Sequence, residues 1–147
     1  MINIGLLEPS DRAAWEELAR GYKEFYETPT SAEQYETAWR QLMDGTEFHA
    51  FGARLDGTLV GITHYFFHPA LWYGEVCYLQ DLFVAEAARG QGAARALIER
   101  VADAARDRGA SSLYWHTQEQ NERARLLYDK VASFKGFIRY QYPLYPL

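Results

Sequence analysis

Hydrophobic residues recur with two different periods along the chain, and these periods predict an ordered series of strands and helices. Residues 2–7 (INIGLL) form a short apolar run that is typical of a first strand. Apolar positions then recur at helical spacing, which predicts a helix from an N-cap at Ser10 to about Tyr26. The residues of this stripe are Trp15, Leu18, Ala19 and Tyr22.

A second helix and a β-hairpin follow. Ser31 and Gln34 form a capping-box pattern, which predicts a helix to about Met43. Residues 48–67 then contain two strand-like runs that are separated by Asp56-Gly57. This dipeptide favours a two-residue type I′ turn, because both central positions of that turn need a positive φ.

The remaining pattern changes from hairpins to alternating strands and helices. We expect a loop at 68–75, strands at 76–84, 111–117 and 136–142, and helices at 92–108 and 121–134. A right-handed crossover through the helix at 92–108 makes the strands on either side of it parallel. The chain is therefore predicted to be α+β, with a mixed sheet and the order β-α-α-β-β-β-α-β-α-β.

Composition limits the class of protein. A length of 147 residues predicts a single domain over 1–147, and the formal charge of −5 argues against a nucleic-acid partner. The same charge is compatible with a cationic substrate, although it is also ordinary for a globular domain. Cys77 is the only cysteine, so no internal disulfide can form. Without a recognisable leader or an apolar run that could cross a membrane, we expect a cytoplasmic protein.

The turn after residue 84 has the composition of an anion site. Gly90 and Gly92 allow a close backbone turn, and small residues keep the start of the next helix clear of bulk. Unpaired N–H groups at a helix start attract phosphate, and Arg89 adds a charge-assisted hydrogen bond. Arg95 follows where a dinucleotide fingerprint has its third glycine, so an oxidoreductase is disfavoured. A glycine-containing loop that merely admits a helix is the alternative.

A second motif lies near the C-terminus. Asn121, Ala124 and Tyr128 occupy one side of a predicted helix, at positions i, i+3 and i+7. Together with Arg89, Gly92 and Ala94 in the preceding turn, this motif makes the chain resemble the GCN5-related N-acetyltransferase (GNAT) superfamily over nearly its whole length. The resemblance is to bacterial members grouped with the yeast histone and polyamine acetyltransferases.

This resemblance implies a site for acetyl-CoA, used as a co-substrate. In the superfamily the fourth and fifth strands splay apart, and the coenzyme lies between them. Its pantetheine would pair with the backbone of Leu82, Phe83 and Val84, and Asn121 and Ala124 would line the thioester end. Its pyrophosphate would contact the turn formed by Arg89, Gly90, Gln91, Gly92, Ala93 and Ala94.

The resemblance also implies roles in catalysis. A backbone N–H near Phe83 or Val84 would stabilise the oxyanion, and Tyr128 would protonate the leaving thiolate or only pack beside it. Gln80 stands where polyamine acetyltransferases often have a glutamate base, which puts the polyamine assignment in doubt. The other candidate bases are Asp81, His116 and Glu75, with His64 and His68 behind them, and a water chain without a dedicated base is a further option.

The acceptor side is expected on the first helix. Tyr22 and Tyr26 lie one helical turn apart beside acidic residues, which suits an amine cation, although Tyr22 also continues the core stripe. Glu75 and Gln80 complete the predicted substrate residues. We therefore expect acetyl transfer to a primary amine of a small molecule or lysine-like side chain, by direct attack in a ternary complex. A non-catalytic acyl-CoA-binding module is the alternative.

No metal, nucleic acid or membrane is predicted as a ligand or partner. A homodimer is plausible because aromatic residues accumulate at the C-terminus, at Tyr140, Tyr142 and Tyr145.

Overall fold

The computed structural model describes residues 1–145 and divides the chain into two compact units, Met1–His116 and Thr117–Leu147. The first unit contains a five-stranded sheet with the order β1-β2-β3-β4-β5. Its strands are β1 (Ile2–Gly5), β2 (Phe48–Leu55), β3 (Thr58–Ala70), β4 (Gly74–Val84) and β5 (Leu113–Tyr114). The first four strands pair antiparallel and β4 pairs parallel with β5, which confirms the α+β class with a mixed sheet.

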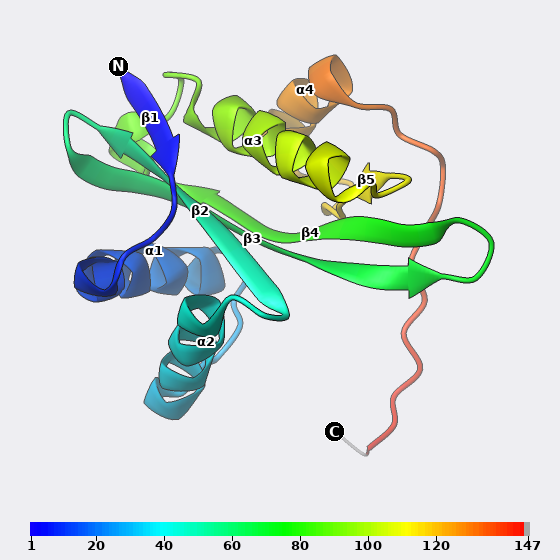
Figure 1. The fold of residues 1–147 in the computed structure, drawn as a ribbon, viewed down its shortest axis with the longest axis horizontal. Coiled ribbons are helices and arrows are strands. Elements are labelled where there is room, and N and C mark those ends of the chain that lie inside the picture. Colours follow the sequence, from blue (N-terminus) through cyan, green and yellow to red (C-terminus); the bar gives the residue numbers. More distant parts are fainter. Residues whose placement is uncertain (146–147) are drawn as a thin grey trace. The chain divides into compact units, whose positions relative to one another are not determined.

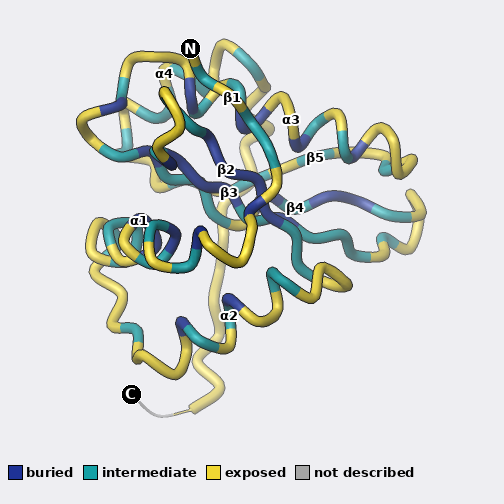
Figure 2. The backbone as a smooth tube through the Cα atoms, turned by 60° about the vertical axis from the view of Figure 1, so that its left-hand side comes forward, coloured by how far each residue is buried: buried dark blue, intermediate teal, exposed yellow. Residues whose placement is uncertain are grey.

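Helices cover both faces of this sheet (Figure 1). The helices α1 (Arg12–Phe25) and α2 (Ala32–Asp44) pack on one face, and α3 (Ala93–Arg108) packs on the other. Burial is concentrated in the strands and in the helix faces turned towards them (Figure 2). None of the helices within residues 1–145 has both the length and the apolar composition needed to cross a bilayer.

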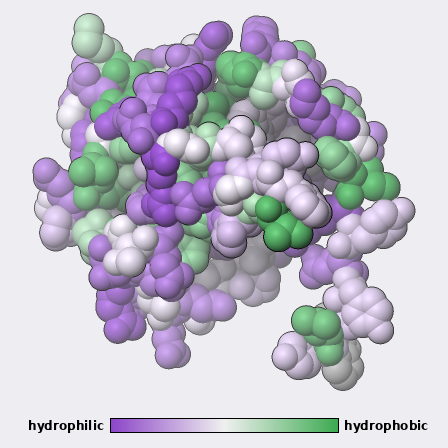
Figure 3. Space-filling view, turned by 45° about the vertical axis from the view of Figure 1, so that its right-hand side comes forward, coloured by the Kyte–Doolittle hydropathy of each residue, from purple (hydrophilic) through white to green (hydrophobic). Residues whose placement is uncertain are grey.

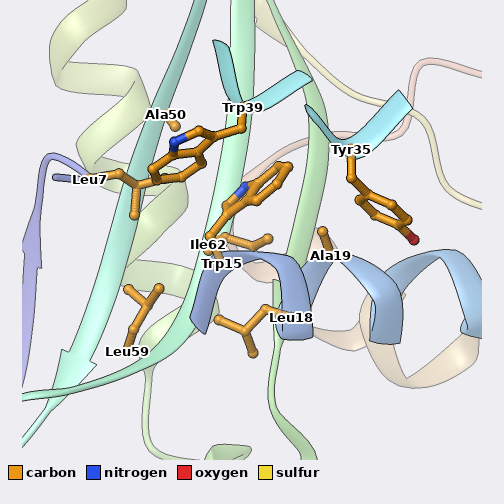
Figure 4. Packing of buried hydrophobic residues seen from close by; sticks show 9 residues of the cluster. All are labelled: Leu7, Trp15, Leu18, Ala19, Tyr35, Trp39, Ala50, Leu59 and Ile62. Atoms are coloured by element: carbon orange, nitrogen blue, oxygen red, sulfur yellow. The ribbon is translucent and has the colours of Figure 1, made fainter. Parts of the chain in front are cut away.

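The core under α1 and α2 is built around Trp15. This indole is 1% exposed and packs against Trp39, whose ring centroid lies 5.1 Å away, and edge-on against Tyr35 (Figure 4). The stripe that predicted α1 supplies three buried residues to this cluster, namely Trp15, Leu18 and Ala19. The helical period therefore identified the buried face of α1 correctly.

The two helix starts on this face differ from each other. Ser31 and Gln34 form the predicted capping box, with reciprocal bonds of 3.1 and 2.8 Å. The predicted N-cap at Ser10 is wrong, because a short 3-10 turn over Pro9–Asp11 precedes α1 and makes Asp11 its N-cap. The Asp11 carboxylate instead accepts hydrogen bonds from the backbone of Glu8 and from Arg54.

Two hairpins form the antiparallel part of the sheet. Asp56 and Gly57 both have positive φ, at 49° and 85°, between the paired residues Leu55 and Thr58, as the predicted two-residue turn requires. The loop predicted at 68–75 is too long, because β3 and β4 continue to Ala70 and from Gly74. Only residues 71–73 separate these two strands.

A β-bulge interrupts the pairing of β3 with β4. Tyr65 lies opposite Leu79, whereas His64 lies opposite Asp81, so Gln80 is the extra residue on β4. A bulge changes which side chains share a face of the strand. Simple alternation would place Tyr78 and Asp81 on opposite faces. With the bulge, both contribute to raising the pKa of Tyr22 on α1.

The strands β4 and β5 separate almost at once. They pair only at Cys77 with Leu113 and at Tyr78 with Tyr114. Within residues 1–145, the β4 edge beyond Tyr78 has no strand partner on that side. This geometry confirms the predicted splaying of the fourth and fifth strands (Figure 1).

The second unit contains α4 (Glu122–Val131) and an extended segment. The strand predicted at 136–142 is wrong for this chain in isolation, since residues 133–145 have no regular secondary structure. A strand forms only when its backbone groups pair with a neighbouring strand. Seven large hydrophobic residues of this segment are exposed: Phe134, Phe137, Ile138, Tyr140, Tyr142, Leu144 and Tyr145.

Candidate active site

A series of hydrogen-bonded side chains, buried at Trp15 and half-buried at the others, joins α1 to the β3–β4 hairpin. Trp15 Nε1 donates a hydrogen bond of 2.9 Å to His64 Nε2, and His64 Nδ1 lies 2.9 Å from Asp81 Oδ2. The hydroxyl of Tyr22 hydrogen-bonds to the same carboxylate. Trp15 and Tyr22 lie seven residues apart, so they project from the same side of α1.

The hydrogen bonds and charges around Asp81 keep its carboxylate ionised. Burial by itself would raise the pKa of Asp81, but the hydrogen bonds with His64 and Tyr22 oppose it, and the pKa is lowered. Burial and the neighbouring Asp81 charge both raise the pKa of Tyr22 far above its ordinary value. Tyr22 therefore stays protonated and donates to a carboxylate whose side chain is 18% exposed.

Aromatic and imidazole groups continue along the same face of the sheet. The ring of Tyr78 stacks on Tyr114 at 4.9 Å, and its hydroxyl lies 3.2 Å from His116 Nδ1. The hydroxyl of Tyr114 is in turn 2.8 Å from His68 Nε2. His116 is thus joined to Tyr78, which, like Asp81, raises the pKa of Tyr22 through its charge.

The open edge of β4 carries the residues predicted to bind the pantetheine. Leu82, Phe83 and Val84 pair on one side with β3, and their other edge has no strand partner within residues 1–145. The ring of Phe83 packs directly against α1, where a Cβ on Gly21 would lie 2.9 Å from it. Gly21 therefore lets Phe83 sit close to the helix.

The predicted phosphate turn has the backbone that such a site needs. Gly90 and Gly92 both adopt a left-handed conformation, with φ of 82° and 85°, and Gly92 is the N-cap of α3. No side chain caps this helix start, so its first N–H groups have no intrahelical or side-chain acceptor. Ala93 is buried, Ala94 is half-buried and Gln91 is exposed.

Arg89 is directed towards the strand in this structure. Its Nε donates to the carbonyl of Val84 at 3.3 Å, and its guanidinium lies over the ring of Phe83 at 5.9 Å. The arginine thus ties the start of the turn to the end of β4, and its predicted bond to phosphate stays a prediction.

Two predicted substrate residues lie elsewhere. Glu75 forms an exposed ion pair with Arg108 of 2.7 Å, which lowers its pKa. It stands six residues from Asp81 on the same strand, a separation of about 20 Å. Gln80 is exposed at the bulge, and Tyr26 packs against Tyr22 with ring centroids 4.9 Å apart.

The motif residues of the second unit lie on one side of α4. Asn121 is the N-cap residue, and its side-chain amide is 3.4 Å from Thr117 Oγ1. Ala124 and Tyr128 are half-buried, whereas Glu122, Arg123 and Leu126 are exposed. This pattern matches the predicted spacing at i, i+3 and i+7, and the roles of these residues stay predictions.

Sequence reasoning places His64 low among the candidate bases and does not include Trp15 in the site. A lone histidine in a strand has no local signal that identifies its partner, and the spacing of Trp15 marks it only as part of the core stripe. A symmetric hairpin about residue 72 would have placed His64 opposite Gln80, and only the bulge brings it to Asp81.

Comparison with known proteins places this architecture in one family. The model of the acetyltransferase (GNAT) family matches residues 12–134. The chain is 38% identical over 136 residues to the D-amino-acid N-acetyltransferase HPA3 of Saccharomyces cerevisiae, which covers 89% of this chain and 84% of that protein. It is 39% identical over 75 residues to the bovine (Bos taurus) thialysine N-epsilon-acetyltransferase, over 51% of this chain and 44% of that protein.

A solved structure shows the same fold. The aminoglycoside N-acetyltransferase in complex with the bisubstrate analogue CoA-S-monomethyl-acetylneamine has a TM-score of 0.86 over 97% of this chain and 98% of its own, at 14% identity.

The chain belongs to the GNAT acetyltransferase family. It is an acyl-CoA-dependent N-acetyltransferase that uses acetyl-CoA as its co-substrate.

Proposed function

We propose that this protein transfers the acetyl group of acetyl-CoA to a primary amine of a small molecule or lysine-like side chain, by direct attack in a ternary complex. The observation that carries the proposal is the ionised carboxylate of Asp81, held by His64 and Tyr22 beside the open edge of β4. A partly accessible anion at this position suits an acceptor that arrives as a cation.

Acetyl-CoA would bind along the open strand edge. Its amides would pair with the backbone of Leu82–Val84 as a short added strand, and its pyrophosphate would accept hydrogen bonds from the turn 89–94. Asn121 and Ala124 would line its thioester. The family model spans the boundary between the two units, which supports a single acetyltransferase domain made of both.

The reaction then follows from ordinary acyl-transfer chemistry. The bound ammonium loses a proton, and its nitrogen attacks the thioester carbonyl carbon, forming a C–N bond. An N–H near Phe83 or Val84 would stabilise the oxyanion. As the intermediate collapses, the C–S bond breaks, the nitrogen loses a second proton and Tyr128 protonates the thiolate. Once Tyr128 is reprotonated, the products are amide, CoA thiol and one proton released.

Proton removal and amine binding fall to different groups in this proposal. A lowered pKa makes Asp81 a weak base, so we assign it to binding the amine cation. The imidazole of His116, which lies 3.2 Å from the hydroxyl of Tyr78, would accept the proton through water. Exposed Gln80 would contact only the outer part of an acceptor, and Glu75 would act only on a long one.

The named activities of two relatives support an amine acceptor of modest size. HPA3 is a D-amino-acid N-acetyltransferase, and the bovine relative acts on the N-epsilon group of thialysine. Tyr22 and Tyr26 add an aromatic surface that would contact the alkyl part of such a substrate.

A screen for thiol release tests the proposal. Purified protein is incubated with acetyl-CoA and a library of primary amines, and free CoA is measured with a thiol reagent. Amine-dependent thiol release above the no-amine rate is expected. Micromolar binding of acetyl-CoA by isothermal titration, without thiol release for any amine, would instead support the non-catalytic acyl-CoA-binding alternative.

We also propose that the protein forms a homodimer through residues 133–145. This segment has the alternating pattern of a strand, and it carries Lys135 and Arg139 but no carboxylate in a chain of net charge −5. The outer edge of β5 on a second copy would supply the missing strand partner. The cytoplasmic location stays a prediction from the sequence.

A further inference from the structure

The hydrogen bond from Trp15 fixes the protonation state of His64. An indole Nε1–H can only donate, so the imidazole nitrogen that receives it, Nε2, must have a free lone pair. The single ring proton of His64 is therefore on Nδ1, where it is donated to Asp81 over 2.9 Å. As long as the Trp15 bond persists, His64 is neutral and does not balance the charge of Asp81.

We propose that Trp15 and His64 are positioning residues that hold Asp81 as an uncompensated anion, and that this anion binds the ammonium form of the acceptor amine. The inference rests on the proposed function, because it assigns the acceptor-binding group of the same site. The uncompensated charge of Asp81 explains why the site attracts a cation, and Trp15 and His64 are the residues that keep this charge uncompensated.

The other groups that face Asp81 do not cancel its charge. From α1, Tyr22 donates a neutral hydroxyl, and Lys23 contributes only a weak charge interaction, with no ion pair to Asp81 among residues 1–145. Tyr78 on β4 and Tyr26 at the end of α1 also face Tyr22, and both are phenols. Apart from Lys23, whose charge is already present, His64 is the group facing Asp81 that could gain a positive charge.

Burial strengthens the attraction between the Asp81 carboxylate and a cation. The side chains of His64 and Asp81 are only 12% and 18% exposed, so water screens their charges poorly. A carboxylate in such a place attracts an ammonium group more strongly than one on the surface would. Protonation of His64 would abolish this attraction, which explains why a donor-only partner at Nε2 matters.

The protonation state can be measured on the protein without substrate. The chain has four histidines, and a His64→Gln variant identifies the His64 signals in ¹H–¹⁵N spectra of the ring nitrogens. We expect one protonated and one bare nitrogen at neutral pH, with the proton on Nδ1. A second ring proton at neutral pH, or a proton on Nε2, would overturn the proposal.

The same spectra test the cation site with a simple probe. Titration with n-butylamine, which is almost fully protonated below pH 8, should shift the His64 signals of the wild type in a saturable way. The shift should be lost in Asp81→Asn, which keeps the size of the side chain and removes its charge. Equal shifts in both proteins would show that Asp81 is not the binding group.

Kinetic measurements with an amine identified in the thiol-release screen distinguish a positioning role of Trp15 from a packing role. In Trp15→Phe the imidazole is free to take a second proton, so the KM for the amine should rise about tenfold as the pH falls from 8 to 6. The matched control is Trp39→Phe, which loses the same indole volume from the same cluster but has no bond to His64. Identical pH profiles of the amine KM in the two variants would contradict the proposal.

A second pair of variants applies if Trp15→Phe does not fold. His64→Asn retains an amide N–H near the position of Nδ1 and should keep the amine KM within about threefold, whereas His64→Gln loses that donor and should raise it about tenfold. The KM for acetyl-CoA should not change in either variant. If no amine is a substrate, the proposed function fails, and the ring-nitrogen spectra still decide the charge of His64.

Discussion

The carboxylate of Asp11 shows how one residue makes stability depend on pH. The bond from Arg54 lowers its pKa despite burial, so the ionised form stabilises the fold. This contribution is present above the unfolded pKa of 3.8 and is lost as the pH falls through the lower folded value. Asp11→Asn should cost about 1–3 kcal/mol of unfolding free energy at pH 7, measured in urea, and much less at pH 3.

The control for this prediction is Asp56→Asn. Asp56 is an exposed carboxylate, 4.0 Å from the N-terminal amine, and its loss should change the free energy of unfolding by less than about 0.5 kcal/mol. A cost for Asp11→Asn that is the same at pH 3 and pH 7 would show that the effect does not come from its charge.

Tyr128 carries the prediction about the leaving group. Tyr128→Phe should lower kcat about 100-fold and change the KM for acetyl-CoA less than about threefold, because the phenol would act on the departing thiolate and not on the bound coenzyme. Steady-state rates of thiol release measure both constants. Tyr73→Phe, at the exposed tip of the β3–β4 hairpin, is the control. An unchanged kcat in Tyr128→Phe would leave Tyr128 only a packing role.

At this scale the sequence indicates individual candidate groups but not the partners that they contact. Asp81, Tyr22 and His116 were identified as candidates from residue type and position. The bond between His64 and Asp81 was not predicted, because it depends on a bulge whose position is set by the pairing of two strands. The bulge also exposes Gln80, so the amide of Gln80 takes no part in the bonding between His64 and Asp81.

Among the elements, the helix α3 allows a matched test of the phosphate turn. Gly92 and Gly109 flank it and have almost equal φ of 85° and 83°, and a Cβ added at either position would meet no atom within 4 Å. Valine at either position should cost about 1–3 kcal/mol of stability through backbone strain alone. Gly92→Val should also weaken acetyl-CoA binding at least about tenfold in isothermal titration, because it distorts the anion-binding amides.

Gly109→Val serves as the control, since it strains the opposite end of the same helix. Its affinity for acetyl-CoA should equal that of the wild type. If both variants bind as tightly as the wild type, the turn 89–94 does not hold the pyrophosphate.

Elements with strong local signals were predicted correctly. The turn at Asp56-Gly57, the capping box at Ser31 and the end of α3 at Gly109 each depend on a few adjacent residues, and the structure confirms all three. The strand at 136–142 depends on a distant partner and is absent from the isolated chain. Residues 111–117 were also predicted as a strand, but only Leu113–Tyr114 pair.

For the whole molecule, the exposed C-terminal segment predicts assembly. Hydrophobic residues lie in small patches among hydrophilic ones on the face drawn in Figure 3, whereas residues 133–145 expose a run of them. The full chain should be a dimer at micromolar concentration in analytical ultracentrifugation. A chain that ends at Ala132 should be monomeric, because it lacks the strand that would pair with a second copy.

Strand geometry supplies the control for this prediction. Lysine at both Ile138 and Tyr140, which lie on one side of an extended strand, should weaken the dimer. Serine at both Arg139 and Gln141, on the other side, should have a smaller effect. A full chain that sediments as a monomer at all concentrations would contradict the dimer proposal.

The short pairing of β4 with β5 has a consequence for how the protein responds to its co-substrate. Amide protons on the unpaired edge of β4 should exchange rapidly with deuterated water when the protein is alone and slowly when CoA lies along that edge. Since only the folded protein offers this edge, ligand binding also raises the melting temperature in proportion to the logarithm of its concentration. If acetyl-CoA binds along β4 as proposed, it would complete the hydrogen bonding of this strand, and its concentration would contribute to the stability of the fold.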